Sequence, residues 1–244
     1  MQHVEDKSMK ILPTIIFNAR PGAGKSELIK YLQSLPADVR EEEFHIGKIQ
    51  VIDDFPFLWR WFEEDEILEK MGHERLFSDQ EGYFKHTYLW DVLIYLINLE
   101  YKKFMRDTPD FATYTTIIEF SRGSQHGGYQ RAYPLLSDDI LQNAALLYLN
   151  VSWKESLRKN KVRFNPEKPD SILEHGIPDE KLEFMYRECD FDEISAKNDD
   201  FINIRGSLIP YSIFENEDDV TSEAKPELAV RLKQCLDTLW EKQI

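Results

Sequence analysis

A short apolar segment followed at once by a glycine-rich turn limits what this chain can fold into more than any other feature. Residues 11–18 read ILPTIIFN, and residues 19–26 read ARPGAGKS. An unbroken run of apolar and β-branched residues predicts a strand buried on both faces. Leu28, Leu32 and Leu35 then recur at the spacing of one helix face. A buried strand, a glycine turn and a helix in this order predict the first unit of a parallel α/β sheet.

The turn itself fits a phosphate-binding pattern. It matches GxxxxGK[ST] with Ala19 in place of the first glycine, a variant of the Walker A pattern of P-loop proteins. Glycines let backbone N–H groups surround a phosphate while the N-terminus of the following helix faces it. We expect these residues to bind a nucleotide: Arg20, Pro21, Gly22, Ala23, Gly24, Lys25 and Ser26. The Lys25 amine would reach the β- and γ-phosphates, and the Ser26 hydroxyl would bind magnesium. A turn that only caps a helix is the alternative, but the strand before it and the helix after it favour nucleotide binding.

Four further apolar segments predict strands, and the stretches between them have helical spacing. The strands are expected at 47–53, 114–120, 145–151 and 207–214. The helices are expected at 56–71, 82–106, 153–161, 179–189 and 226–242. Apolar strands that alternate with helices predict a doubly wound α/β fold, with a five-stranded parallel sheet and helices on both faces. Ligands of such folds bind beyond the carboxyl ends of the strands.

Composition excludes several classes of protein. The 244 residues include 30 Lys+Arg and 45 Asp+Glu, which gives a net charge of −15. Binding to a nucleic acid backbone needs clustered cations, so we expect no nucleic acid partner. The most apolar stretch, residues 89–99, contains Asp91 and is too short to span a membrane. The charged first residues predict no signal peptide, and Cys189 and Cys235 cannot build a disulfide framework. We therefore expect a cytoplasmic protein with a small-molecule partner; whether it forms a homodimer stays open.

Two carboxylates end the second predicted strand. Asp53 and Asp54 directly follow Val51-Ile52. A carboxylate at this end of a strand beside the glycine turn would lie at the mouth of the site, where it could take the proton of an acceptor hydroxyl. In the alternative interpretation, the two residues form a turn and cap the helix at 56–71.

This segment resembles the acidic-Pro-Trp stretch of the deoxynucleoside kinases. Those kinases place a carboxylate five residues before a Trp, and Asp54 and Trp59 have this spacing. It is also similar to the Asp-Asp-Phe stretch of uridine and nicotinamide-riboside kinases. Both resemblances favour Asp54 over Asp53 as the catalytic base, although the sequence leaves the choice between the two open, and they imply that Asp53 and Trp59 lie close to the acceptor. The sequence departs from the deoxynucleoside kinases in having Asp for Glu, and Phe55 between the acid and the proline.

Glu119 near the end of the third strand is suited to hold a magnesium-bound water, and Arg122 to contact a phosphate of the substrate. Deoxynucleoside kinases have Glu-Arg-Ser at this strand end. The resemblance implies that Glu119 matches their Glu, whereas Arg122 lies two positions beyond their Arg. His126, a little further on, is expected to be an exposed loop residue, because kinases of this kind rarely need imidazole.

A cluster of cations follows the fourth strand. Residues 154–163 have a local charge of +4 in an otherwise acidic chain. The stretch resembles the strand–helix–Arg–lid pattern of nucleoside and nucleoside-monophosphate kinases, whose lid arginines clamp the transferring phosphoryl group. This implies that Arg158 and Arg163 take part in catalysis and that a small lid lies at about 154–178. The alternative is a solvated helix face that balances the acidic surface.

The layout of residues 1–244 is most similar to that of a single-domain deoxynucleoside kinase with a P-loop NTPase fold. It predicts an enzyme that uses ATP and Mg²⁺ to transfer the γ-phosphoryl group to a hydroxyl or phosphate of a small, nucleoside-like acceptor. A nucleoside monophosphate or another metabolite is an alternative acceptor. The alternative from another class is a nucleotide-binding regulator that transfers nothing. The chain lacks the NKxD motif that a GTPase would need to recognise its base.

Overall fold

One six-stranded sheet organises the protein in the computed structural model, which describes residues 11–163, 167 and 177–243. The strands are β1 (Thr14–Ala19), β2 (Lys48–Asp53), β3 (Tyr114–Phe120), β4 (Ala144–Asn150), β5 (Phe201–Ile204) and β6 (Ser207–Glu215). Their order across the sheet is β2-β3-β1-β4-β6-β5. All pairings are parallel except that of β5 with β6. The glycine turn therefore follows a strand in the middle of the sheet.

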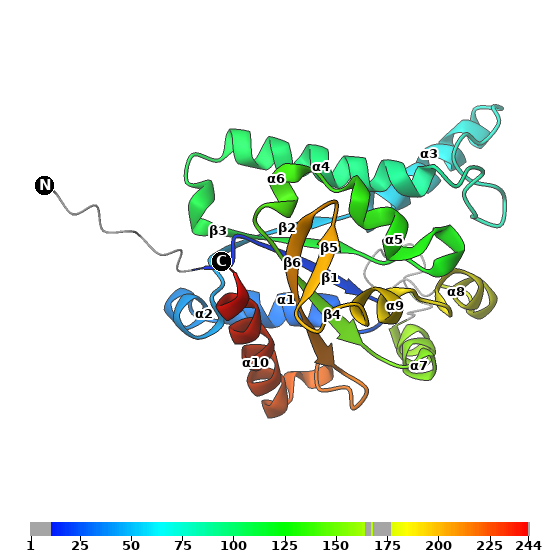
Figure 1. Ribbon diagram of the computed structural model, residues 1–244. Coiled ribbons are helices and arrows are strands. Elements are labelled where there is room, and N and C mark those ends of the chain that lie inside the picture. The colour runs from blue at the N-terminus through cyan, green and yellow to red at the C-terminus, as the bar shows by residue number, and fades with distance from the viewer. Residues whose placement is uncertain (1–10, 164–166, 168–176, 244) are drawn as a thin grey trace, which may run out of the picture.

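Helices occupy both faces of this sheet (Figure 1). They are α1 (Lys25–Ser34), α2 (Ala37–Phe44), α3 (Phe55–Lys70), α4 (Leu89–Asp107), α5 (Gly128–Ala132), α6 (Asp138–Leu141), α7 (Trp153–Arg163), α8 (Asp179–Tyr186), α9 (Phe191–Ser195) and α10 (Pro226–Lys242). Short 3₁₀ turns are η1 (Phe111–Thr113), η2 (Ser124–His126), η3 (Tyr133–Leu135) and η4 (Ser222–Ala224). The α/β class is thus confirmed.

Alternate residues of β1 supply two separate cores. Ile15 and Phe17 pack with the leucines of α1 and α10 on one face. Ile16 packs on the other face with Ile97 and Tyr101 of α4. Because both faces of the strand are covered, its sequence is a continuous apolar run rather than an alternating one.

The expectation of five strands was wrong by one strand. The sixth, β5, has only four residues and forms an antiparallel hairpin with β6 at the edge of the sheet. Arg205 and Gly206 connect the two strands, and both have positive φ angles of 51° and 92°. A two-residue connection with positive φ at both positions matches the twist of paired strands.

The helix expected at 82–106 also needs correction, since α4 begins only at Leu89. The segment before it turns back on itself, with a β-bridge between Ser78 and Phe84. The buried Asp65 of α3 holds this segment by accepting the amide hydrogens of Leu76 and Ser78 at 2.6 and 2.7 Å. Among the described helices, none combines the length and apolar character that a membrane span requires.

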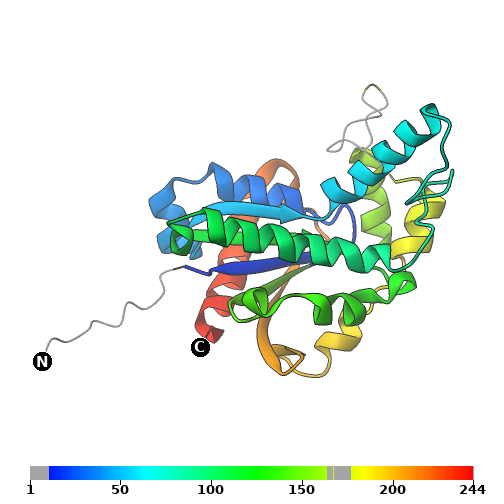
Figure 2. The same ribbon diagram turned by 90° about the horizontal axis from the view of Figure 1, so that it is seen from above.

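Three helices meet beyond the carboxyl ends of the parallel strands. Side chains of α3, α7 and α8 share one apolar cluster, which includes Trp61, Leu157 and Leu182. Figure 2 shows these helices together at one end of the sheet, with α3 extending away from it. This end is where the fold is expected to bind a ligand.

Candidate functional site

A cleft of about 1200 Å³ opens at the carboxyl ends of the strands. Its wall contains these residues that the sequence singled out: Pro21, Gly22, Ala23, Gly24, Lys25, Ser26, Asp53, Asp54, Trp59, Glu119, Arg122, Arg158 and Arg163. Arg20 is the one predicted site residue outside the lining. Its guanidinium donates instead to the carbonyl oxygens of Val151 and Arg187 at 3.1 and 3.3 Å.

The glycine turn, residues 20–24, has the conformation that its sequence requires. Gly24 has φ = 106°, and a Cβ there would lie 2.5 Å from Thr221 Oγ1 and 2.7 Å from Asn216 Nδ2. Both the backbone angle and the space therefore demand glycine. The N–H groups of Gly22, Gly24, Lys25 and Ser26 donate no hydrogen bond to any part of the chain that the structure describes. A concentration of unpaired amides at a helix N-terminus is suited to an anion.

The Lys25 amine lies within the same cleft, between the turn and the end of β3. It donates to Ser121 Oγ at 2.9 Å and lies 3.6 Å from Glu119 Oε1. The side chain is buried, and burial of an ammonium is favourable only next to such partners. Lys25 thus adds a positive charge to the unpaired amides.

Asp53 and Glu119 stand side by side because β2 and β3 pair in parallel with these two residues in register. Burial, followed by the charges of Glu119 and Asp54, raises the pKa of Asp53 to about 8. Burial also raises the pKa of Glu119, against the attraction of Lys25. Asp53 Oδ1 accepts the N–H of Phe55 at 3.0 Å and so caps the start of α3, as in the alternative interpretation. Burial and mutual repulsion therefore disfavour the charged forms of these two adjacent carboxyl groups.

Asp54 has a different partner from Asp53. Its Oδ2 lies 2.6 Å from Nη1 of Arg122, which also donates to the Ser121 carbonyl at 2.7 Å. Both residues are buried, and the guanidinium lies 5.1 Å from the centre of the Trp90 ring. Burial raises the pKa of Asp54, and Arg122 opposes this by favouring the carboxylate. Arg122 was expected to contact a phosphate; in the structure its guanidinium forms a buried ion pair with Asp54.

Oxygen-bearing side chains at the strand ends could hold magnesium. Within the described residues there is no group of three or more His, Cys, Asp and Glu side chains arranged to hold a metal ion. A magnesium ion that arrives with a nucleotide does not need such a group, because it keeps several waters and uses phosphate oxygens with one or two carboxylates. Asp53 and Glu119 supply adjacent carboxylates whose charged forms burial disfavours, and Ser26 lines the same cleft. These residues fit a magnesium ion.

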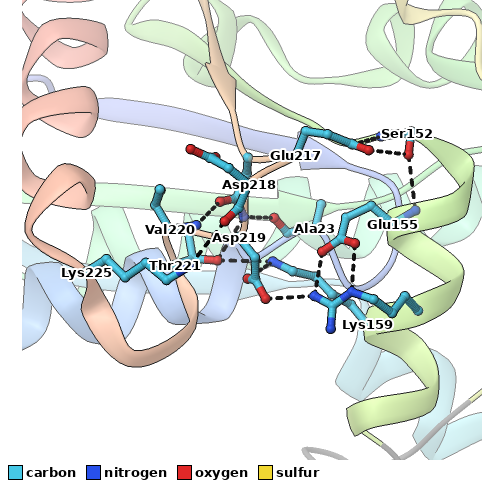
Figure 3. A network of polar contacts seen from close by, with 12 residues as sticks. Ala23, Ser152, Glu155, Lys159, Glu217, Asp218, Asp219, Val220, Thr221 and Lys225 are labelled. Carbon is cyan, nitrogen blue, oxygen red and sulfur yellow. Dashed lines mark hydrogen bonds and ion pairs between the residues drawn. The ribbon is translucent and has the colours of Figure 1, made fainter.

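Helix α7 and the segment after β6 are joined by charged side chains over the glycine turn (Figure 3). Arg158 pairs with Glu155 at 2.6 Å and with Asp219 at 2.8 Å. Lys159 lies 2.6 Å from Asp219 and 3.3 Å from Thr221 Oγ1. Lys159 is buried, whereas the Arg158 side chain is 49% exposed. The cation that α7 buries next to the turn is therefore Lys159, which the sequence did not single out.

Arg163 ends α7 and lines the cleft, where its charge favours the ionised form of Glu119. The remainder of the expected lid, residues 164–166 and 168–176, lies outside the described residues.

Aromatic side chains form the part of the cleft between α3, the segment before α4, and α8. They are Phe55, Trp59, Phe62, Tyr83, Phe84, Trp90, Phe184 and Tyr186. His126 is half-buried, rather than exposed as expected, and its ring stacks on Trp90 with centroids 4.3 Å apart. Burial, followed by the charge of Arg122, lowers the pKa of His126 to about 4, so its imidazole is neutral at pH 7.

Sequence reasoning missed Ser156, Lys159, Asn216 and Thr221, which surround the glycine turn. Ser156 and Lys159 are three residues apart on one helix, and this spacing is a weak signal for a shared face. Asn216 directly follows β6, so its place at a strand's carboxyl end could have marked it.

Comparison with known proteins adds little to this picture. No family model matches the chain, and no curated protein matches it either. One solved structure, the crystal structure of APE1195, aligns with 94% of this chain and 98% of its own, at 13% identity and a TM-score of 0.38. A likeness at that level carries no argument about family or activity, so the function has to be argued from the site itself.

Proposed function

We propose that this protein is an ATP- and magnesium-dependent kinase with a P-loop NTPase fold, which phosphorylates a hydroxyl group of a small molecule. The observation that carries the proposal is the glycine turn: its unpaired amides, the Lys25 amine and the Asp53–Glu119 carboxylates line one cleft. Amides and a lysine bind phosphate oxygens, and paired carboxylates with a serine hydroxyl suit the accompanying magnesium.

The roles of the individual side chains follow from where they lie. The turn amides and Lys25 would bind the phosphate chain, and Ser26, Glu119 and Asp53 would hold magnesium. The ion would neutralise the negative charge of the transferring phosphoryl group. Asp54, whose carboxylate form Arg122 favours against the effect of burial, would orient the acceptor hydroxyl and take its proton.

The acceptor side of the cleft favours a hydroxyl acceptor over a phosphate acceptor. Within the described residues, three cations on this side already have partners: Arg122 pairs with Asp54, Arg75 with Glu69 at 2.8 Å, and Lys181 with the carbonyl oxygen of Glu81 at 3.2 Å. A phosphate group of an acceptor would have to break one of these contacts. Aromatic rings dominate the same wall and offer stacking to a flat ring. A nucleoside is therefore a better candidate than a nucleoside monophosphate.

Acceptor-dependent release of ADP tests this function. The panel consists of matched pairs, each a nucleoside and its 5′-monophosphate, together with unrelated hydroxyl metabolites and their phosphates. We expect ADP release with an unphosphorylated member and none with Lys25→Ala. Tight ATP binding with no acceptor-dependent turnover across the panel would contradict the kinase and favour a regulator.

A further inference from the structure

Two buried side chains from distant elements hold the glycine turn from outside. The Ser156 hydroxyl of α7 donates to the Pro21 carbonyl at 2.7 Å, and Asn216 Nδ2 donates to the Ala23 carbonyl at 2.8 Å. Asn216 lies directly after β6, almost 200 residues along the chain from the turn, and both side chains are fully buried. The proposed function assigns no role to either of them.

These two hydrogen bonds fix the direction of the turn's amides. The described chain has no cis peptide bond, so the carbonyl and the N–H of each peptide unit lie in one plane and point in opposite directions. The bond to Ser156 therefore turns the Gly22 N–H away from α7, and the bond to Asn216 turns the Gly24 N–H away from β6. Both amides are among the unpaired N–H groups, and both glycines line the cleft.

The orientation of the Asn216 amide is itself determined. Its Oδ1 accepts the N–H of Val220 at 3.0 Å, and its Nδ2 also donates to Thr221 Oγ1 at 2.8 Å. A flipped amide would place NH₂ against the Val220 N–H and oxygen against the Ala23 carbonyl, so both contacts would become repulsive. The donor can therefore face only the turn.

We propose that Asn216 and Ser156 are positioning residues for phosphate binding. They fix two peptide planes of the glycine turn so that the Gly22 and Gly24 amides already point at the place of the phosphate chain before a ligand arrives. A turn that is already ordered loses less conformational entropy when the ligand binds, and its N–H dipoles need not reorient. This inference rests on the proposed function, because it presupposes a ligand with a phosphate chain.

Affinity for MgATP and for magnesium tripolyphosphate, measured by calorimetry, tests the proposal. Tripolyphosphate isolates the phosphate chain from the base and sugar. We expect Asn216→Ala and Ser156→Ala each to weaken both ligands by about 10-fold, the usual worth of one lost positioning hydrogen bond. Asn216→Asp keeps the acceptor for Val220 but sets an oxygen against the Ala23 carbonyl, so it should weaken binding further. Asn150→Ala is the matched control, because the Asn150 amide bonds only Glu215 at the same sheet end.

A merely structural role would give a different result. Urea unfolding without ligand measures the stability of each variant, and steady-state kinetics should show a raised KM for ATP with an unchanged KM for the acceptor. If Asn216→Ala does not fold, Ser156→Ala carries the test alone. Folded variants with wild-type affinity for tripolyphosphate, or a loss confined to ATP, would overturn the positioning role. Absence of ATP and tripolyphosphate binding by the wild-type protein would instead overturn the proposed function.

Discussion

Arg122 and Asp54 form a buried ion pair that links the ends of the two neighbouring strands β3 and β2, with 2.6 Å between Nη1 and Oδ2. Removing one partner of such a pair leaves the other charge buried and unpaired, which costs roughly 3–5 kcal/mol of stability. The pair also favours the carboxylate form of Asp54, which is the form that a general base needs. The same ion pair therefore contributes to the stability of the protein and to the charge of the proposed general base.

Asp54→Asn is expected to lower acceptor phosphorylation by about 10²–10⁴-fold, the usual span for loss of a general base, while ATP still binds. The amide keeps the shape of the carboxylate but cannot take the proton. The measurement is ADP release with a confirmed acceptor, alongside ATP affinity and urea unfolding to separate lost chemistry from lost stability. Asp53→Asn should instead raise the magnesium concentration that turnover requires, and at saturating magnesium it should lower the rate less than Asp54→Asn does, because the asparagine oxygen can still accept the Phe55 N–H and face the ion. The reverse order of the two variants would identify Asp53 as the base.

Lys25→Ala is expected to abolish ATP binding or turnover while the protein stays folded. The amine contacts Ser121 and Glu119 inside the cleft and fills no part of either apolar core, so its main effect is on phosphate charge. Circular dichroism checks the fold, and calorimetry with MgATP checks binding. Wild-type affinity and activity in a folded variant would contradict the role of the glycine turn.

Arg158→Ala and Arg163→Ala are each expected to lower kcat by roughly tenfold or more, with a smaller effect on ATP affinity. This is the pattern of a contact made mainly in the transition state. For Arg158 the role requires that its guanidinium leave Glu155 and Asp219 during turnover. Pre-steady-state and steady-state rates of both variants provide the measurement. Unchanged kcat in both would reduce the cluster to a solvated helix face.

Much of the fold could be predicted from sequence because the sheet is buried on both sides. Strands covered by helices read as unbroken apolar runs, and the one expected at 114–120 is confirmed as β3 without a shift. Strand β5 was not predicted, because its four residues FINI are too few to form such a run and lie at the edge of the sheet. The start of α4 was misplaced because the aromatic residues of 82–88 have helical spacing, although a β-bridge joins Phe84 to Ser78, which Asp65 holds in place.

Local charge placed Arg158 and Arg163 among the candidate site residues, and position at a strand end placed most of the others. Asp53 and Glu119 were found this way, since parallel strands bring their carboxyl ends to one edge. The ion pairs could not be predicted from the sequence, because residue spacing does not show that Arg122 contacts Asp54 rather than a phosphate. Ser156 was missed because its role arises from a tertiary hydrogen bond to a backbone carbonyl, which leaves no pattern along the chain. Asn216 follows a strand end, but that position does not show that its amide bonds a carbonyl of the glycine turn.

Asp53→Asn is expected to stabilise the protein at neutral and alkaline pH even as it removes a carboxylate from the magnesium side of the site. The pKa of Asp53 is about 8 in the folded protein, chiefly because of burial, against 3.8 as its ordinary value. Between these two values the folded chain holds a proton that the unfolded chain releases. The stability of the wild-type protein that depends on this proton is therefore complete below about pH 4 and is lost as pH rises through about 8.

Asparagine carries no charge at any of these pH values and still accepts the Phe55 N–H. The gain in the free energy of unfolding should accordingly be close to zero at pH 4 and grow with pH by roughly 1 kcal/mol per pH unit until it levels off near pH 8. Urea unfolding of both proteins at pH 4, 6 and 8.5, without nucleotide or magnesium, measures it. A gain that does not change with pH would show that Asp53 is not the buried acid described here.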